Sequence, residues 1–475
     1  MTLRSNTDVL GGIAAERPDA VALWDQGVET RIADLTRNAA KAARALAGLG
    51  LAKGDTVLVG WDSLTRHVTL LLALEGLGVT AASFDGPLDR SGYHALFDEA
   101  SRVLTPREDA STSIPATVTD DTWWTDVLSG QNANMPGQPL APEDGFRIVR
   151  TSGTTGQANL MRASRSAAYA RIDALHREYG YTSSSRFMTA MPFSFQAVDH
   201  NAFACLRCGG TVIFETRVPF VDALIDTKPT HAALLPMEVQ NLDRPTCRPI
   251  DGDPLTLLVY GGALSDVMLT RLQGRHPAVT FAATYATNEV GTVARRVTEG
   301  VYRVIEDAEV QVTDDQDNPL PAGAEGHIRV RRLGMYDGYI GDPERSALRF
   351  RDGWFYPGDI GSMTEDGLLR VIGRADDILN IRGLKLPATR METEIQRIDG
   401  IADAALVDSP NTGGLCLIVS LAPGAALEGI VPKVREILPR EAGEIQLLTT
   451  ASIPRTNSGK VRRNALRASL KQAAG

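Results

Sequence analysis

The chain has 475 residues, of which 43% are hydrophobic and 23% charged, and its formal net charge is −9. This length exceeds what one compact core usually holds, so we expect a globular protein of at least two domains. The acidic balance argues against a nucleic-acid partner, and the lack of a long apolar run argues against a membrane span or a secretory signal, which favours a cytoplasmic protein.

The N-terminal part predicts alternating helices and strands. Apolar residues recur at spacings of three and four over 32–49, which predicts an amphipathic helix. Buried strands are expected at 56–59 and 79–82, on either side of an apolar stretch at 70–77. This alternation indicates an α/β layered fold. Residues 105–145 are rich in Thr, Asp, Pro and Ser, and we expect them to form a surface excursion rather than core.

Later strands are predicted where short apolar runs are bounded by glycine, at 146–149, 211–214 and 257–260. From 314 to 373, many short runs with Gly, Asp and Pro turns indicate an antiparallel sheet or a small barrel. The residues after 376 predict a separate small α+β domain. Its expected elements are a helix at 388–398, strands near Ala404 and Leu415, and a second helix near Val431.

The four cysteines are too few for a disulfide framework in a chain of this length, which fits a reducing compartment. Cys205 and Cys208 form a C-x-x-C pair, but no second pair or Cys/His cluster stands nearby to complete a metal site. We therefore expect both thiols to pack in a core helix.

A glycine- and hydroxyl-rich segment directly follows the strand predicted at 146–149. It consists of Thr151, Ser152, Gly153, Thr154, Thr155 and Gly156. Backbone N–H groups and hydroxyls in such a loop can surround the phosphates of a nucleotide. The spacing is not that of a Walker P-loop, and a flexible hydroxyl-rich turn is the alternative interpretation.

Further segments follow this loop in a fixed order along the chain. They are Gly261-Gly262-Ala263, Tyr285-Ala286-Thr287-Asn288-Glu289, Trp354 to Asp359, Gly373 to Asp377 with Ile381-Arg382-Gly383, and Pro454 to Lys460. Together with the loop they resemble the motifs of the adenylate-forming superfamily, which includes acyl- and aryl-CoA synthetases, the adenylation domains of nonribosomal peptide synthesis, and firefly luciferase. The resemblance extends over nearly the whole chain.

The resemblance implies an α/β protein of two domains. Residues 1–375 would form a large ATP- and acid-binding domain of layered sheets and helices with a small barrel-like subdomain. Residues 376–475 would form a small mobile α+β domain that holds the catalytic lysine.

The implied reaction is the ATP-dependent activation of a small-molecule carboxylic acid as its acyl-adenylate, with release of pyrophosphate. The acyl group would then pass to a thiol, either of coenzyme A or of the phosphopantetheine arm of a separate carrier protein. An amine acceptor is an alternative, and so is a degenerate member that binds nucleotide without turnover.

The resemblance also assigns roles to residues. Lys460 would bridge the carboxylate and the α-phosphate, and Glu289 would hold Mg²⁺, with Thr155 as the third catalytic residue. The implied ATP-binding residues are Thr151, Ser152, Gly153, Thr154, Thr155, Gly156, Gly261, Gly262, Ala263, Tyr285, Ala286, Thr287, Asn288, Asp359, Arg374 and Lys460.

The small domain would rotate about Asp376 between the two half-reactions. In the second pose, the segment around Gly383 and Lys385 would face the acceptor.

The residues expected to line the acid pocket come from several predicted elements. They are Phe195, Gln196, Ala197, Asp199, His200, Glu238, Leu258, Tyr260 and Thr284. Gln196 stands where members that activate α-amino acids have an aspartate for the substrate ammonium. The usual partner of the ammonium group is therefore missing. Leu258, Tyr260 and Thr284 would complete a small pocket closed by an aromatic ring, which favours a compact aryl or short functionalised acid over a long fatty acid.

Some positions depart from the pattern of the superfamily. Ala158 and Asn159 replace the usual Pro and Lys after the loop, and an asparagine brings no charge to the phosphates. Arg162 or Arg165 is expected to supply that charge instead. Pro357, Ala286 and Arg390 also differ from the residues usual at their positions.

Overall fold

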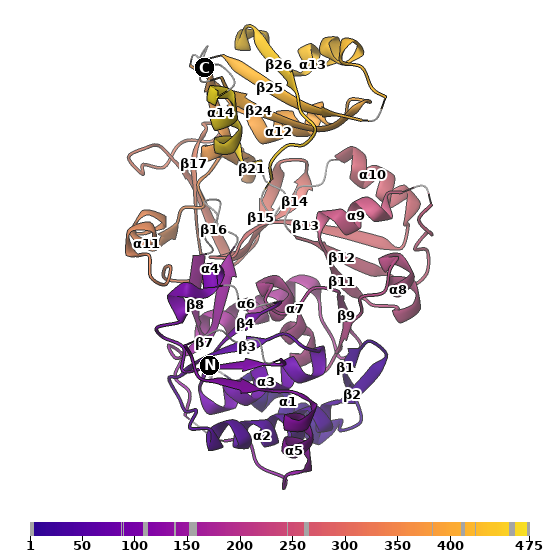
Figure 1. Cartoon of the computed structure of the whole chain (residues 1–475), viewed down its shortest axis with the longest axis vertical. Helices are drawn as coiled ribbons and strands as arrows, with labels where there is room; N and C mark the ends of the chain where they lie inside the picture. The colour runs from indigo at the N-terminus through magenta and orange to yellow at the C-terminus, as the bar shows by residue number, and fades with distance from the viewer. Residues whose placement is uncertain are drawn as a thin grey trace. The chain divides into compact units, whose positions relative to one another are not determined.

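The computed structural model confirms the predicted α/β class (Figure 1). It describes residues 4–86, 88, 90–107, 113–136, 139–151, 159–244, 246–260, 266–381, 383–409, 414–422, 424–455 and 461–472. Two compact units can be distinguished. The N-terminal unit comprises Met1–Glu309 and Val330–Phe355, and the C-terminal unit comprises Val310–Arg329 and Tyr356–Gly475. The domain boundary expected after residue 375 stays a prediction.

One sheet of the N-terminal unit has the strand order β6-β5-β3-β4-β7-β8. Its strands are β3 (Thr56–Gly60), β4 (Thr80–Phe84), β5 (Arg102–Thr105), β6 (Ala116–Val118), β7 (Gly145–Thr151) and β8 (Asn159–Ser164). Neighbouring strands are parallel except for the antiparallel pair of β7 and β8.

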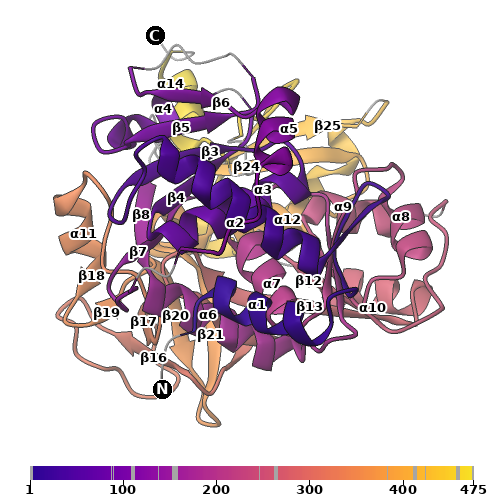
Figure 2. The same cartoon turned by 90° about the horizontal axis from the view of Figure 1, so that it is seen from below.

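Helices α2 (Ile32–Gly48) and α3 (Leu64–Leu77) lie side by side next to this sheet (Figure 2). The predicted amphipathic helix is confirmed by α2, which buries its apolar stripe. Nearly all of α3 is buried, because α1 (Asn6–Glu16), α2 and several strands surround it. Ser63 caps its N-terminus, and Gly78 ends it in the left-handed region at φ +77°.

Seven further strands of the N-terminal unit form one part of a 15-stranded sheet, in the order β13-β12-β11-β9-β10-β1-β2. These strands are β1 (Val21–Asp25), β2 (Val28–Arg31), β9 (Arg186–Thr189), β10 (Thr211–Phe214), β11 (His231–Leu234), β12 (Leu255–Val259) and β13 (Val279–Thr287). All pairs are parallel except that of β1 with β2. Helices α6 (Arg165–Tyr179) and α7 (Gln196–Arg207) share one hydrophobic core with residues of both sheets.

The remaining elements of the N-terminal unit are mostly short. They are α4 (Arg90–Tyr93), η1 (His94–Leu96), α5 (Asp121–Ser129), α8 (Phe220–Thr227), α9 (Pro236–Leu242), α10 (Asp266–Arg275), β14 (Gly291–Thr298), β15 (Val301–Val304), α11 (Pro343–Arg349), β18 (Phe350–Arg351) and β19 (Trp354–Phe355). Strands β16 (Ala308–Thr313) and β17 (Gly326–Arg332) run from one unit into the other along the chain.

The prediction of a surface excursion over 105–145 is wrong for residues 121–129. These residues form α5, and Trp124 is buried in the main core. The helix forms here because Asp120 caps its N-terminus and Trp123 and Trp124 present apolar surface to the core.

The C-terminal unit contains an antiparallel part and a small α+β part, as predicted. Its elements are β20 (Asp359–Met363), β21 (Leu368–Arg374), η2 (Ala375–Asp377), β22 (Ile378–Ile381), β23 (Leu384–Pro387), α12 (Ala388–Ile395), β24 (Ile401–Asp408), β25 (Leu415–Leu421), η3 (Leu427–Gly429), α13 (Val431–Ile437), η4 (Arg440–Ala442), β26 (Ile445–Thr449) and α14 (Arg463–Gln472). Alternate residues of β24 belong to different cores: Leu406 packs with α12, and Ala405 packs with α14. The two helices therefore cover opposite faces of the β24–β25–β26 sheet (Figure 1).

All four cysteines lie in the described part of the chain and are free thiols. The prediction of core packing is confirmed for Cys205, which is fully buried in α7. It holds only in part for Cys208, which packs against the same core from the C-cap of α7 but is partly exposed, with its Sγ 2.9 Å from Nδ1 of His176.

Candidate active site

The ends of the predicted phosphate loop are paired with one another. Thr151 ends β7, is buried, and is the register partner of Asn159, the first residue of β8. The intervening Ser152, Gly153, Thr154, Thr155, Gly156 and Ala158 lie outside the described residues. Gly261, Gly262, Ala263 and Lys460 also lie outside them. The loop therefore joins two antiparallel strands.

Asn159 contacts an arginine that the sequence did not single out. Its Oδ1 accepts a hydrogen bond of 2.8 Å from Nη1 of Arg345 in α11. The two arginines expected to compensate for the missing lysine are engaged elsewhere. Arg162 donates to Glu99 Oε2 at 2.8 Å, and the buried Arg165 donates to the carbonyl oxygen of Glu75 at 3.3 Å.

The segment Tyr285 to Glu289 forms the end of β13 and the turn into β14. Thr287 is the register partner of Gly291, and its hydroxyl accepts from the backbone N–H of Val290 at 3.1 Å. The Tyr285 ring lies 5.8 Å from the ring of Tyr302 on β15. The neighbouring Ala286 and Asn288 are exposed. A hairpin turn therefore presents the motif at the end of a strand.

A buried arginine of α6 donates hydrogen bonds to the backbone of this turn. Arg171 donates to the carbonyl oxygens of Asn288 at 2.8 Å and Gly334 at 2.6 Å, and also to that of Glu289. Its guanidinium carbon lies 3.8 Å from the ring centroid of Tyr336. A Cβ at Gly334 would come within 2.8 Å of the carbonyl oxygen of Ala167 in α6, so a glycine is needed where this segment approaches the helix.

The carboxylate of Glu289 accepts a hydrogen bond from the hydroxyl of Tyr339 at 2.9 Å. Burial, reinforced by the adjacent Glu289, raises the pKa of Tyr339, so the phenol keeps its proton and stays a donor. The contact holds Glu289 in one orientation.

The start of α7 lies against the same turn. The side-chain oxygen of Gln196 accepts from Nη1 of Arg171 at 2.8 Å, and its nitrogen donates to the carbonyl oxygen of Asn288 at 3.1 Å. Its amide also contacts the hydroxyl of Tyr336. The structure thus brings a residue expected in the acid pocket next to a residue expected in the ATP site.

One turn further along α7, Asp199 and His200 are buried at 4% exposure each. Oδ1 of Asp199 lies 3.5 Å from Nε of Arg147, which is itself buried on β7. Burial raises the pKa of Asp199 to about 6, although the positive charge of Arg147 opposes this shift. Burial also lowers the pKa of His200, whose Nε2 has no hydrogen-bond partner among the described residues. Asp199 is therefore half of an internal ion pair.

The other residues expected in the acid pocket have varied surroundings. Phe195 is 44% exposed just before α7, and Leu258 is fully buried in the main core. Ala197 is partly buried in α7 and accepts from Asn201 through its carbonyl, while the Tyr260 hydroxyl also accepts from Asn201 at 2.9 Å.

Glu238 and Thr284 belong to elements other than α7. The carboxylate of Glu238 accepts from the backbone N–H of Leu235 at 2.8 Å, which is the contact of a helix cap on α9. Thr284 lies within β13 opposite Arg295 of β14.

Within the C-terminal unit, Asp359 and Arg374 are register partners on β20 and β21. Nη1 of Arg374 lies 3.6 Å from Oδ1 of Asp359 and donates to the carbonyl oxygen of Pro357 at 2.7 Å. Asp359 is 8% exposed, so the arginine compensates a carboxylate that is largely removed from water.

The predicted hinge and acceptor-facing residues follow directly after β21. Asp376 lies in η2, and its side chain is outside the described ones, as are those of Lys385 on β23 and Arg390 in α12. Gly383 occupies the turn between β22 and β23 at φ +91°, and its N–H donates to Oδ1 of Asn380 at 2.9 Å. A glycine suits this turn because other residues rarely adopt that backbone conformation.

The residues present at Glu289 fit a magnesium ion that is held largely by substrate. The described residues include no cluster of three or more His, Cys, Asp or Glu side chains that could hold a metal alone. Glu289 offers one oriented carboxylate, and Mg²⁺ commonly binds one or two carboxylates together with substrate phosphates.

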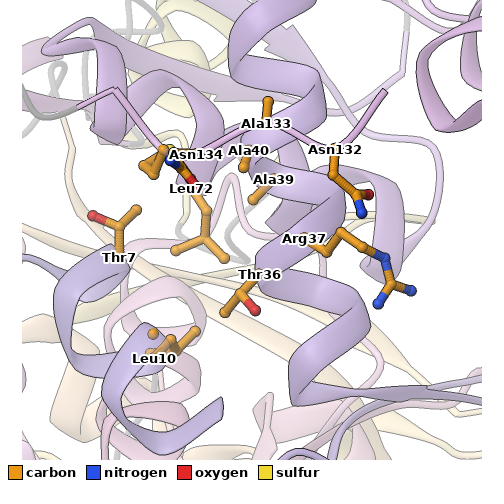
Figure 3. Close-up of a pocket in the computed structure, with 12 residues that line it drawn as sticks. Thr7, Leu10, Thr36, Arg37, Ala39, Ala40, Leu72, Asn132, Ala133 and Asn134 are labelled. Carbon is orange, nitrogen blue, oxygen red and sulfur yellow. The ribbon is translucent and has the colours of Figure 1, made fainter. Parts of the chain in front are cut away.

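A cavity of about 370 Å³ lies elsewhere, next to α1 and α2 (Figure 3). Its lining includes Leu10, Thr36, Arg37 and Asn134. None of the predicted site residues lines it, so we do not assign the reaction to it.

Sequence reasoning missed Arg171, Tyr339 and Arg345, which contact site residues from distant parts of the chain. None belongs to a predicted motif. The only signal in the sequence was the absence of a lysine at Asn159, which indicated that a cation should come from elsewhere.

Comparison with known proteins identifies the family. The model of the family described as AMP-binding enzyme matches residues 12–340, which is more than half of the chain. A CoA ligase of Mycobacterium tuberculosis, named for an octahydroindenyl-propanoyl group, is 27% identical over 98% of this chain and 99% of its own length. The 3-hydroxybenzoate–CoA ligase of Aromatoleum is 28% identical over 73% of this chain and 70% of its own length.

The fold agrees with solved structures of similar size. The crystal structure of ATP-bound MatB from Rhodopseudomonas palustris superimposes with a TM-score of 0.84 over 99% of this chain and 100% of that one, at 20% identity. No helix among the described residues has the length and apolar character needed to cross a bilayer. The expectation of an adenylate-forming ligase is confirmed at the level of the family. This chain belongs to the AMP-binding enzymes.

Proposed function

We propose that the chain activates a carboxylic acid with ATP and transfers the acyl group to a thiol. In the first half-reaction a carboxylate oxygen forms a bond to the α-phosphorus, and the bond to pyrophosphate breaks. In the second, the sulfur forms a bond to the acyl carbon, and the bond to AMP oxygen breaks. One observation supports this proposal most strongly. Arg171 donates hydrogen bonds both to Gln196, from the predicted acid pocket, and to the carbonyl oxygen of Asn288, from the predicted ATP motif.

Two anions must meet in the first half-reaction, so the site must offer positive charge that acts most strongly in the transition state. We assign that charge to Lys460, with the loop residues Thr151 to Gly156 around the phosphates. Mg²⁺ bound at Glu289 would neutralise phosphate charge. The Tyr339 hydroxyl keeps this carboxylate in place.

Several motif residues are assigned to the nucleoside. We propose that Tyr285 stacks against adenine with Gly261, Gly262 and Ala263 at its edge. Asp359 would accept from the ribose hydroxyls while Arg374 holds its carboxylate. Asp376 would serve as the hinge for the second half-reaction, in which the segment of Gly383 and Lys385 faces the thiol.

We propose a compact aryl or short functionalised acid as the substrate. Gln196 is neutral and its amide is occupied by protein partners, so no charge at this position would attract an ammonium group. Asp199, which follows in the same helix, is acidic but is paired with Arg147. Two relatives are named as CoA ligases of ring-bearing acids, which supports the same choice and favours coenzyme A as the acceptor.

Acid-dependent exchange of pyrophosphate into ATP tests this proposal across aryl, short-chain, fatty and α-amino acids. We expect exchange with aryl or short functionalised acids, and then a thioester when coenzyme A is added. Exchange with α-amino acids alone would overturn the substrate assignment, and thioester formed only on a carrier protein would overturn the acceptor. ATP binding without exchange by any acid would favour the degenerate alternative.

A further inference from the structure

The position that lacks the usual lysine has an arginine against it. Asn159 is 186 residues from Arg345 in sequence, yet the two side chains are joined by a hydrogen bond of 2.8 Å. Arg345 is presented by α11, where its backbone N–H donates to Oδ1 of Asp342 at the N-cap. The cap and the short helix therefore set the direction from which Arg345 approaches the end of the loop.

Strand geometry separates Arg345 from the other arginines near the loop. Thr151 and Asn159 are register partners and so point to the same face of the β7–β8 pair. Arg150 and Arg162 occupy the alternate positions and point to the other face. Arg150 lies over the ring of Tyr93 at 5.3 Å, and Arg162 pairs with Glu99.

The charge of Arg345 is available for a ligand. Its hydrogen-bonding partner is a neutral amide, and no carboxylate among the described residues lies within ion-pairing distance of its guanidinium. Its guanidinium carbon lies 5.8 Å from the ring centroid of Tyr339, and the Tyr339 hydroxyl donates to Glu289. Arg345 thus contacts the residue at the end of the phosphate loop and lies near Tyr339, which holds the carboxylate assigned to Mg²⁺.

We propose that Arg345 takes over the role of the missing lysine and binds the terminal phosphates of ATP. This inference rests on the proposed function, since it concerns the nucleotide of the same site. A guanidinium offers paired N–H donors that match phosphate oxygens, and it keeps its charge at all relevant pH values. Asn159 then orients the arginine by accepting one of its N–H groups, instead of supplying charge itself.

The variant Arg345→Gln isolates charge from positioning, because a glutamine amide can still donate to Asn159. We expect R345Q to weaken binding of MgATP, measured by titration calorimetry, by about tenfold or more, as for loss of a charged hydrogen bond. The matched control is Arg162→Gln, which removes the same charge from the other face of β8 and should change the affinity by less than about twofold. Thermal unfolding checks that both variants are folded.

Restoring lysine at Asn159 gives a second readout. In the R345Q background, Asn159→Lys should regain most of the lost affinity. In the wild type it should gain little, because the two cations would repel one another. Unchanged affinity in R345Q, an equal loss in R162Q, or an equal gain from N159K in both backgrounds would each overturn the proposal.

The proposed function can fail separately. If R345Q loses affinity but the wild type exchanges pyrophosphate with no acid, the role of Arg345 stands and the proposed function fails. If the wild type exchanges pyrophosphate and R345Q binds ATP normally, only the role of Arg345 fails. A wild type that does not bind MgATP would overturn both.

Discussion

Asp199 and Arg147 form a buried ion pair, and protonation of Asp199 can be followed through its effect on the free energy of unfolding. Burial raises the pKa of Asp199 from 3.8 to about 6 in the folded protein. An acid with a raised pKa binds its proton more tightly when folded, so it favours folding below about pH 4, and this contribution is lost as the pH rises to about 6. A shift of about two units corresponds to a change of about 3 kcal/mol in the free energy of unfolding.

The variant Asp199→Asn keeps the shape of the side chain and removes its titration. Unfolding in urea is compared for the two proteins between about pH 4 and pH 7. We expect the stability of D199N relative to the wild type to increase by up to about 3 kcal/mol over this range, since only the wild type must bury a charge at neutral pH. Taking the difference removes the contribution of His200, which is present in both proteins. A difference that stays constant within about 0.5 kcal/mol would refute the reasoning.

Three further changes test other contacts. Arg171→Met leaves the carbonyl oxygens of the motif turn without their donor, so we expect the free energy of unfolding in urea to fall by about 3 kcal/mol or more. We also expect a higher KM for ATP, and an unchanged KM would show that Arg171 does not support the ATP site. Glu238→Ala removes the acceptor of a helix cap and should cost about 1 kcal/mol in the free energy of unfolding. The range of acids used in the exchange assay should stay the same, and an altered range would support a place for Glu238 in the acid pocket. Asp359→Asn should abolish the preference for ATP over 2′-deoxy-ATP, compared as kcat/KM, whereas a retained preference would exclude a contact with that hydroxyl.

The fold could be predicted from sequence where one face of an element is buried. The stripe of α2 and the short apolar run of β10 are local patterns that a single segment contains in full. The helix α5 was missed because its capping residue and its two tryptophans stand among many turn-forming residues. Local composition there gives no sign of the distant core that Trp124 enters.

Only those site residues that belong to a sequence motif could be predicted. The turn from Tyr285 to Glu289 was placed by its own sequence pattern, but its support by Arg171 depends on the packing of α6 against a segment far along the chain. The contact of Arg345 with Asn159 likewise depends on tertiary structure, whereas the sequence pointed to Arg162, which is nearer along the chain and pairs with Glu99. Glu238 has a structural contact that its sequence position did not reveal, because its carboxylate accepts from the backbone N–H of Leu235 at the start of its own helix, and its place in the acid pocket stays a prediction.

The measurement that tests the central claim most directly follows the oxygen atoms of the acid. A substrate found by pyrophosphate exchange is labelled with ¹⁸O in its carboxylate and incubated with the enzyme, MgATP and coenzyme A, and the products are analysed by mass spectrometry. If the acid is activated as its adenylate, attack by the thiol leaves one carboxylate oxygen on AMP, so we expect AMP that contains one ¹⁸O atom together with an acyl thioester. Label found in inorganic phosphate beside ADP, with unlabelled AMP, would contradict the account.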